Sequence, residues 1–165
     1  MQNRPIIKHS SSNFDRILQL ISYAFFALLW GATLYAWYSL PDTIPVHFNF
    51  KGEVDRQGSK NNMLILPLLG SFIFIIISLL VRYPHKFNYT VPITEENAAK
   101  QYANAILMMR WLLAAVMIIL FSLVLGTILI VQKIDINISY LLLPLILGLL
   151  SLPMLIFIIR SFKLK

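Results

Sequence analysis

Residues 63–81 read MLILPLLGSFIFIIISLLV, nineteen residues without an Asp, Glu, Lys, Arg or His. A helix needs about 20 apolar residues to cross the hydrocarbon core of a bilayer. Residues 17–38, 111–131 and 138–159 also lack these residues, so the sequence predicts four membrane spans at about residues 17–38, 63–81, 106–131 and 138–160. We expect helices because lipid cannot satisfy the backbone N–H and C=O groups of an irregular chain.

The composition of the whole chain agrees with these spans. Hydrophobic residues make up 58% of the 165 residues and charged residues 13%, whereas a soluble domain carries about 25% charged residues. This excludes an ordinary soluble domain and a disordered chain. The absence of cysteine excludes disulfides, thiolate metal sites, iron–sulfur clusters and cysteine catalysis.

The distribution of Lys and Arg predicts the orientation. If the four spans alternate in direction, ten of these residues lie at the two termini and in the 82–110 connection, and four lie on the other side. Cytoplasmic loops carry the excess of Lys and Arg, so we expect a multi-pass protein of the cytoplasmic (inner) membrane with both termini cytoplasmic. The net charge of +7 then reflects topology, and the expected partner is the lipid bilayer and not a nucleic acid.

These observations predict an all-α integral membrane protein. We expect four transmembrane helices in two antiparallel hairpins, forming a single domain over residues 1–165. The first span exceeds the roughly 7–15 apolar residues of a signal peptide and is interpreted as a retained helix. Residues 39–62 form the extracytoplasmic loop between the first two spans, and its composition indicates that it is ordered.

A further feature predicts where the third helix begins. Thr94 followed by Glu95 and Glu96 is typical of a helix start, so the third helix is expected to begin near Glu95. We interpret its first turns as a plain extension out of the membrane that leaves Lys100 and Arg110 solvated or near headgroups. A docking helix for a cytoplasmic partner is the alternative.

The small residues and the prolines inside the spans predict where helices pack closely and where a helix bends. Small residues four apart allow close helix packing and occur at Ala27/Gly31, Ala32/Ala36 and Ser122/Gly126. Pro153 is expected to kink the fourth helix, with Ser151 helping to satisfy the freed backbone.

The most informative stretch is the loop sequence LPDTIPVHFNFKGEVDRQGSK, residues 40–60. Apolar residues alternate with other residues from Ile44 to Lys51, which is typical of a half-buried extended segment. Its polar face presents His47 and Asn49. Lys51-Gly52 is a turn signal, and Asp55–Gly58 suits a type I turn.

Ten positions of this loop also carry a family resemblance: Leu40, Pro41, Ile44, Pro45, His47, Phe48, Gly52, Asp55, Gly58 and Lys60. This pattern, placed directly after a first membrane span, resembles the family of the domain of unknown function 1648. The resemblance covers residues 17–82. The family is shared with the N-terminal part of SdpI-type bacterial immunity proteins, so the resemblance implies a bacterial membrane protein linked to toxin immunity, without established chemistry.

Three interpretations of the loop remain open. As a structural lock, Asp42, Asp55 and Lys60 pair and His47 bonds a backbone carbonyl. As a recognition site, the loop binds a toxin peptide, a lipid headgroup or a partner protein. As a metal site, His47 and Asp55 are the weak candidate ligands, with Asp42 or Glu53. The candidate ligand-binding or structural residues are Pro41, Asp42, Pro45, His47, Phe48, Asn49, Gly52, Asp55, Gly58 and Lys60.

The sequence therefore favours a non-enzymatic membrane protein. A nucleophile–His–acid set, a glycine-rich phosphate loop and a pair of catalytic carboxylates are all missing from the sequence, so we expect neither catalysis nor a cofactor. The favoured role is recognition of an extracytoplasmic ligand or toxin, as an immunity-like or accessory factor with a peptide or protein partner. One alternative is a small transporter or divalent-metal-binding membrane protein, and another is a structural subunit of a larger membrane complex.

Overall fold

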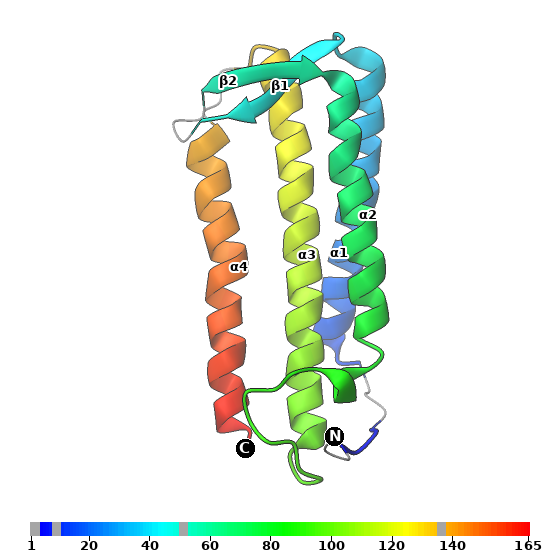
Figure 1. Cartoon of the computed structure of the whole chain (residues 1–165), viewed down its shortest axis with the longest axis vertical. Helices are drawn as coiled ribbons and strands as arrows, with labels where there is room; N and C mark the ends of the chain where they lie inside the picture. Colours follow the sequence, from blue (N-terminus) through cyan, green and yellow to red (C-terminus); the bar gives the residue numbers. More distant parts are fainter. Residues whose placement is uncertain (1–3, 8–10, 50–52, 135–137) are drawn as a thin grey trace.

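The computed structural model describes residues 4–7, 11–49, 53–134 and 138–165, with the side chains of residues 138–141 left aside. In this part of the chain, four long helices run side by side (Figure 1). They are α1 (Asn13–Ser39), α2 (Ile65–Leu80), α3 (Ala98–Val131) and α4 (Ile138–Lys163). Four helices are long and apolar enough to cross a membrane, which indicates a multi-pass membrane protein.

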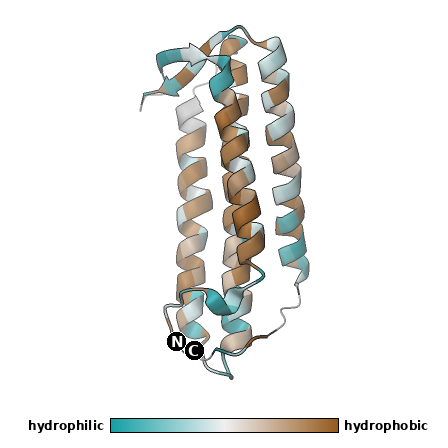
Figure 2. Cartoon of the chain, turned by 45° about the vertical axis from the view of Figure 1, so that its right-hand side comes forward, coloured by the Kyte–Doolittle hydropathy of each residue, from teal (hydrophilic) through white to brown (hydrophobic). Residues whose placement is uncertain are grey.

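The two ends of the bundle differ. Both termini lie at one end, called here the termini end, and a small β-sheet covers the other, called the hairpin end (Figure 1). Figure 2 shows hydrophobic residues along the helices, whereas hydrophilic residues gather in the sheet and in the connections at the termini end. This distribution fits a bundle whose middle lies in lipid.

The expectation of an all-α fold is wrong at the hairpin end. Strand β1 (Thr43–Phe48) pairs antiparallel with β2 (Val54–Ser59), and the register shifts on either side of His47. The extended segment expected from Ile44 onward is therefore found within β1. A 3₁₀ turn, Lys60–Leu64, then leads into α2.

The type I turn expected at Asp55–Gly58 is also wrong, because these residues form β2. Gly58 lies opposite Ile44 in the ladder. A Cβ at Gly58 would come within 3.1 Å of the Val46 and Asn62 side chains, so this glycine serves close packing and not a turn. The turn signal at Lys51-Gly52 lies outside the described residues.

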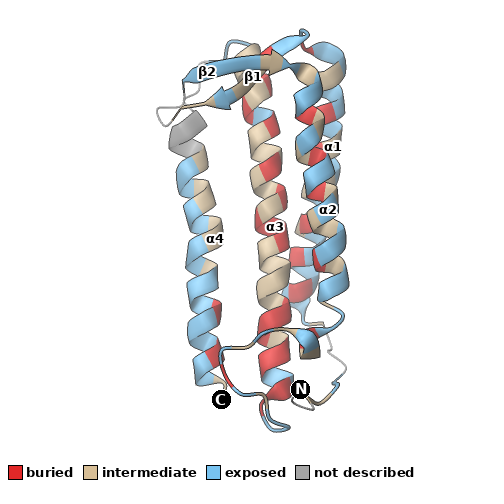
Figure 3. Ribbon diagram, in the orientation of Figure 1, coloured by how far each residue is buried: buried red, intermediate tan, exposed pale blue. Residues whose placement is uncertain are grey.

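Helix α3 is the centre of the bundle. It packs most extensively on α1, then on α4 and α2, whereas α1 and α2 contact each other much less. Figure 3 shows that buried residues concentrate on α3, while α4 is mostly exposed. The expected arrangement in two antiparallel hairpins is not confirmed: α3 packs closely on α4, as the second hairpin requires, but α1 packs much more on α3 than on α2.

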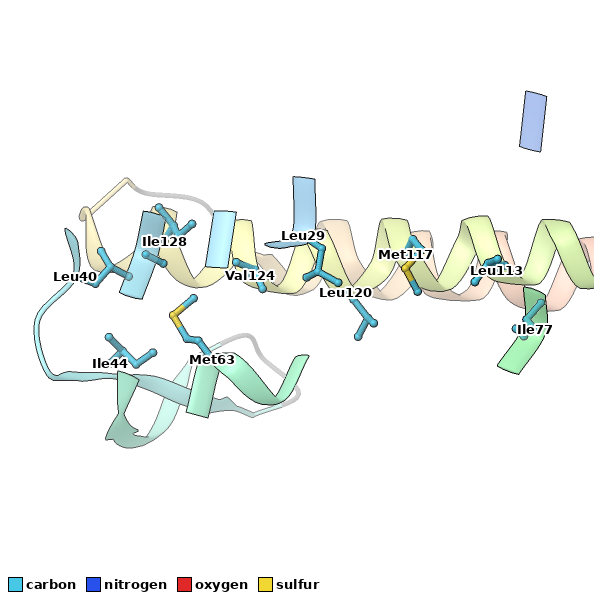
Figure 4. Close-up of a cluster of buried hydrophobic side chains, with 11 residues drawn as sticks. Leu29, Leu40, Ile44, Met63, Ile77, Leu113, Met117, Leu120, Val124 and Ile128 are labelled. Atoms are coloured by element: carbon cyan, nitrogen blue, oxygen red, sulfur yellow. The ribbon is translucent and has the colours of Figure 1, made fainter. Parts of the chain in front are cut away.

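A continuous apolar core connects α3 to the sheet (Figure 4). Met117 and Val124 of α3 are fully buried, and Ile44 of β1 is 1% exposed. Ile44 and Met63 lie against the end of α3 that carries Ile128 (Figure 4). The hairpin is thus held to the bundle by burial of apolar side chains, which is worth about 1.5–3 kcal/mol for each fully buried side chain.

The expected small-residue packing holds at one place and fails at another. Ala36 is fully buried, but Gly31 has no atom within 4 Å of the position its Cβ would take. The Ala27/Gly31 pair therefore faces away from the rest of the described chain. Close approach occurs at Gly70 instead, where a Cβ would lie 2.9 Å from Leu29 and 3.1 Å from Leu120.

The first turns of α3 do not extend freely. The helix begins at Ala98, after a turn in which Thr94 and Asn97 exchange backbone-to-side-chain hydrogen bonds. Gln101 and Tyr102 are buried against other parts of the chain. The first turns of α3 therefore pack within the protein. The turn that precedes the helix begins at Thr94, as predicted, but the helix itself begins at Ala98, three residues after Glu95.

Helix α4 continues through Pro153, which cannot donate a hydrogen bond to the carbonyl of Leu149. Trp111 of α3 supplies this bond, since its indole Nε1 donates to the Leu149 carbonyl oxygen at 3.0 Å. The residue expected for this role was Ser151. A partner from the neighbouring helix satisfies the backbone instead and ties α4 to α3.

Candidate functional site

The hairpin brings together most of the motif residues, beginning with His47. The Nδ1 atom of His47 lies 2.6 Å from Oδ1 of Asp55 on the opposite strand. The two side chains are 54% and 41% exposed. In the lock interpretation His47 was expected to bond a backbone carbonyl, but its partner is the Asp55 carboxylate. The hairpin therefore presents an exposed His47–Asp55 pair on one face.

A second pair closes the base of the hairpin. Lys60 Nζ lies 3.1 Å from Oδ1 of Asp42 and donates to the Leu40 carbonyl oxygen at 3.4 Å. The Lys60 ammonium also lies 5.8 Å from the ring centre of Trp37. The three charged residues of the lock interpretation thus divide between two pairs, Asp42 with Lys60 and Asp55 with His47.

The far end of the hairpin is closed by Asn49 and Glu53. Asn49 Nδ2 donates to Oε2 of Glu53 at 2.9 Å, and the Glu53 backbone N–H donates to Oδ1 of Asn49 at 3.0 Å. These bonds hold the ends of the connection together. Gly52, the remaining candidate residue in this turn, lies outside the described residues.

An apolar groove of about 610 Å³ lies beneath the hairpin, between β1, α2 and α3. Its walls include Val46 from β1, Leu66 from α2 and Leu123 from α3. Three candidate residues line it: Pro45, Phe48 and Gly58. Pro41, in contrast, is exposed at the end of α1. Polar groups of Arg56, Gln57 and Asn62 complete the rim of the groove.

The described part of the hairpin offers few metal ligands. No group of three or more His, Cys, Asp or Glu side chains gathers anywhere in the described ranges. His47 and Asp55 provide two ligands, while Asp42 pairs with Lys60 and Glu53 bonds Asn49. A structural zinc site needs four ligands, so these two residues alone do not form one.

The termini end holds polar contacts that the sequence prediction did not assign. Gln101 Nε2 donates to the carbonyl oxygens of Ser161 and Leu164, and the Ser161 hydroxyl donates to Gln101 Oε1. Asn104 Nδ2 donates to the Phe157 carbonyl at 3.0 Å. The spacing of Gln101, Asn104 and Trp111 along one helix face is the sequence signal that could have indicated this contact line with α4.

The N-terminal segment packs on the 82–98 connection at this end. The Arg4 guanidinium lies 5.5 Å from the ring centre of Tyr89 and donates to the Phe87 carbonyl. The Tyr89 hydroxyl donates to the Pro84 carbonyl at 2.9 Å. Burial raises the pKa of the Tyr89 phenol well above its usual range. The connection is therefore a packed layer.

Comparison with known proteins finds a family similar to the hairpin region. Residues 24–70 match the family described as domain of unknown function (DUF1648). An uncharacterized protein of the archaeon Archaeoglobus fulgidus is 43% identical over 70 residues, which cover 38% of each chain. No solved structure matches. The match includes both strands, most of α1 and the start of α2, so the similarity to this family lies where the loop motif predicts it.

Proposed function

We propose that the chain is a non-enzymatic protein of the cytoplasmic membrane with the hairpin outside and both termini inside. The distribution of charge supports this orientation. Of the described Lys and Arg residues, nine lie at the termini end and three, Arg56, Lys60 and Lys133, lie at the hairpin end. Positive residues are enriched on the cytoplasmic side of membrane proteins.

In this orientation the hairpin is a recognition site for an extracytoplasmic peptide, in an immunity-like or accessory role. The observation that carries the proposal is the groove under β1, because it combines apolar walls at Val46, Leu66 and Leu123 with a polar rim. Ligand sites are typically concave and apolar, with a few polar groups that set orientation. An amphipathic peptide presents both kinds of surface.

The sheet itself favours a peptide over a metal or a small solute. The described sheet has two strands, so each strand has one edge without a strand partner. An extended peptide can add to such an edge through main-chain hydrogen bonds while alternate side chains enter pockets. The groove lies along β1, and its lining includes Ile44, Pro45, Val46 and Phe48 of this strand.

The orientation is tested by labelling engineered cysteines, for which the cysteine-free chain is a clean background. We expect a membrane-impermeant maleimide to label Glu53→Cys in intact cells and to label Lys100→Cys only after the membrane is opened. The reverse pattern would overturn the orientation and, with it, an extracytoplasmic hairpin.

Recognition is tested with a library of ten-residue peptides that alternate apolar and polar residues, added to the protein in nanodiscs. We expect saturable binding by a subset, lost in Val46→Lys, which places a charge in the groove. The matched control is Val54→Lys, the same change on β2 outside the groove lining. Binding that survives Val46→Lys, or a library without a binder, would contradict the proposal.

The variant His47→Ala separates recognition from a purely structural lock. Loss of peptide binding with unchanged thermal stability supports recognition at the exposed His47–Asp55 pair. Lower thermal stability with unchanged binding supports the lock. Elemental analysis of the purified protein beside this variant tests the metal alternative: one divalent ion per chain, absent from His47→Ala, would replace the peptide proposal.

A further inference from the structure

A second cavity lies at the termini end, on the opposite half of the bundle from the groove. It has a volume of about 260 Å³ and lies between α1, α2 and α3. Polar and charged side chains from all three helices line it: Gln19, Ser22, Ser78, Arg82 and Arg110. A polar cavity between three membrane helices marks a candidate binding site, because ionisable residues in such positions are usually functional.

Arg110 is the partly buried cation of this cavity. Its side chain is 16% exposed, and its closest acidic neighbour, Asp15, is 4% exposed. The Arg110 Nη1 to Asp15 Oδ1 distance is 3.9 Å, well beyond the roughly 2.7–2.9 Å of a strong charge-assisted hydrogen bond. The Asp15 Oδ2 atom accepts hydrogen bonds from the Ser12 backbone N–H and hydroxyl, both at 2.8 Å, so this carboxylate also caps α1.

The guanidinium of Arg110 has few partners for its five N–H donors. Among the described residues, Nη1 is buried without a hydrogen-bond partner. Nη2 donates to the Ser11 hydroxyl at 3.4 Å. Positive charge at this wall of the cavity is therefore incompletely compensated, and an anion in the adjacent space would lower the cost of keeping Arg110 buried.

Arg82 adds a second positive charge at the mouth of the cavity. It lies two residues after Leu80, the last residue of α2, and is exposed. The Tyr23 hydroxyl, which accepts a hydrogen bond from Gln19 at 2.9 Å, retains its own proton for donation. Two arginines and a hydroxyl that line one cavity are the kinds of group that bind phosphate, since arginine binds phosphate oxygens in a planar fork.

The surroundings of the cavity indicate where the phosphate comes from. The Tyr23 and Phe74 rings lie 5.4 Å apart and give the cavity an apolar wall. On the flanking helices, Leu20 of α1 and Leu79 of α2 are exposed, as expected of surfaces that face lipid. Basic pockets between transmembrane helices on the cytoplasmic side bind anionic headgroups.

We propose that this cavity binds the phosphate group of an anionic phospholipid in the leaflet at the termini end. Arg82 and Arg110 contact the phosphate, and the Tyr23–Phe74 wall contacts the glycerol and the upper acyl chains. The site is independent of the hairpin groove, which lies at the other end of the bundle.

The test is native mass spectrometry of the full chain in detergent, titrated with dioleoylphosphatidylglycerol. We expect saturable binding of one lipid, weakened about fivefold in Arg82→Gln, because each cation near the phosphate contributes about 1 kcal/mol. The matched control is Arg160→Gln, which removes an exposed cation in the last turn of α4 at the same end but outside the cavity. Arg110→Gln alone risks misfolding, so Arg82→Gln carries the test.

Three outcomes would overturn the proposal. Equal affinity for dioleoylphosphatidylcholine would show that the negative headgroup is not recognised. Equal weakening in Arg160→Gln and Arg82→Gln would show nonspecific attraction to the charged end. Competition by millimolar inorganic phosphate, with the same dependence on Arg82, would assign the site to free phosphate and not to a lipid.

Discussion

The two ends of the molecule use polar residues in opposite ways. The hairpin end is dense in motif residues, yet its His47–Asp55 pair is about half exposed. The termini end has no comparable motif, yet Gln101 is 1% exposed and bonds the backbone carbonyls of Ser161 in α4 and of Leu164 just after it. Exposed ion pairs contribute about 0–1 kcal/mol, whereas an unsatisfied buried group costs about 1–3 kcal/mol.

This difference shows that the residues of the sequence motif are not the residues that contribute most to the stability of the fold. The polar motif residues at the hairpin end are accessible, which is what a binding surface requires. The buried amides at the termini end fix α4 to α3, a role that needs only a suitable donor at the right depth. We therefore expect substitutions at the termini end to lower stability most and substitutions at the hairpin end to change binding most.

The largest effect is expected for Gln101→Ala. The change leaves the Ser161 hydroxyl and the carbonyls of Ser161 and Leu164 without their amide partner, so we expect a loss of about 2–3 kcal/mol in the free energy of unfolding. An SDS unfolding titration in mixed micelles measures it. The control is Lys100→Ala, one residue away and exposed. Equal losses in both variants would break the comparison between the two ends.

The middle of the bundle provides the next test, at Gly70. A methyl group there would lie 2.9 Å from the Leu29 side chain, so Gly70→Ala is expected to cost about 1–2 kcal/mol through overpacking. The control Gly31→Ala meets open space and should be neutral or stabilising by up to about 1 kcal/mol, because alanine favours helix. The same SDS titration compares them, and a neutral Gly70→Ala would rule out close packing there.

Trp111→Phe is expected to have a smaller effect, about 1 kcal/mol, typical of a hydrogen bond between membrane helices. Its indole bonds the Leu149 carbonyl that Pro153 leaves free. In a Pro153→Ala background the alanine N–H can bond Leu149, so the cost of Trp111→Phe should fall. A double-mutant cycle by SDS titration measures the coupling. Additive costs would show that the indole bond and the proline are unrelated.

The helices were predictable because their signal is local and strong, a run of about 20 apolar residues. The alternation from Ile44 was similarly readable as an extended segment. The pairing of β1 with β2 was not, since Asp55–Gly58 carries a good local turn signal and only the contact with β1 makes it a strand. Local pattern cannot decide between two structures that both satisfy the backbone.

Within the candidate site, the sequence indicated which residues matter but not their partners. Asp42, Asp55 and Lys60 were expected to pair, yet nothing local assigns Asp55 to His47 and Asp42 to Lys60. The groove could not be predicted from the sequence either, because Leu123 of α3, which lines it, lies far along the chain from the hairpin. Partners that depend on helix packing need the tertiary structure.

The smallest effect on stability is expected for Asp55→Asn. The change removes the charge of the His47 partner while keeping a hydrogen-bonding group of the same shape, and both side chains are well exposed. We expect about 0.5 kcal/mol or less in the SDS titration, within the range of exposed ion pairs. Asp42→Asn is the comparison, at a pair in which the Asp42 side chain is 94% and the Lys60 side chain 21% exposed. A loss above about 1.5 kcal/mol for Asp55→Asn would mean that the motif pair stabilises the hairpin as the buried amides stabilise α4, and the distinction between the two ends would no longer hold.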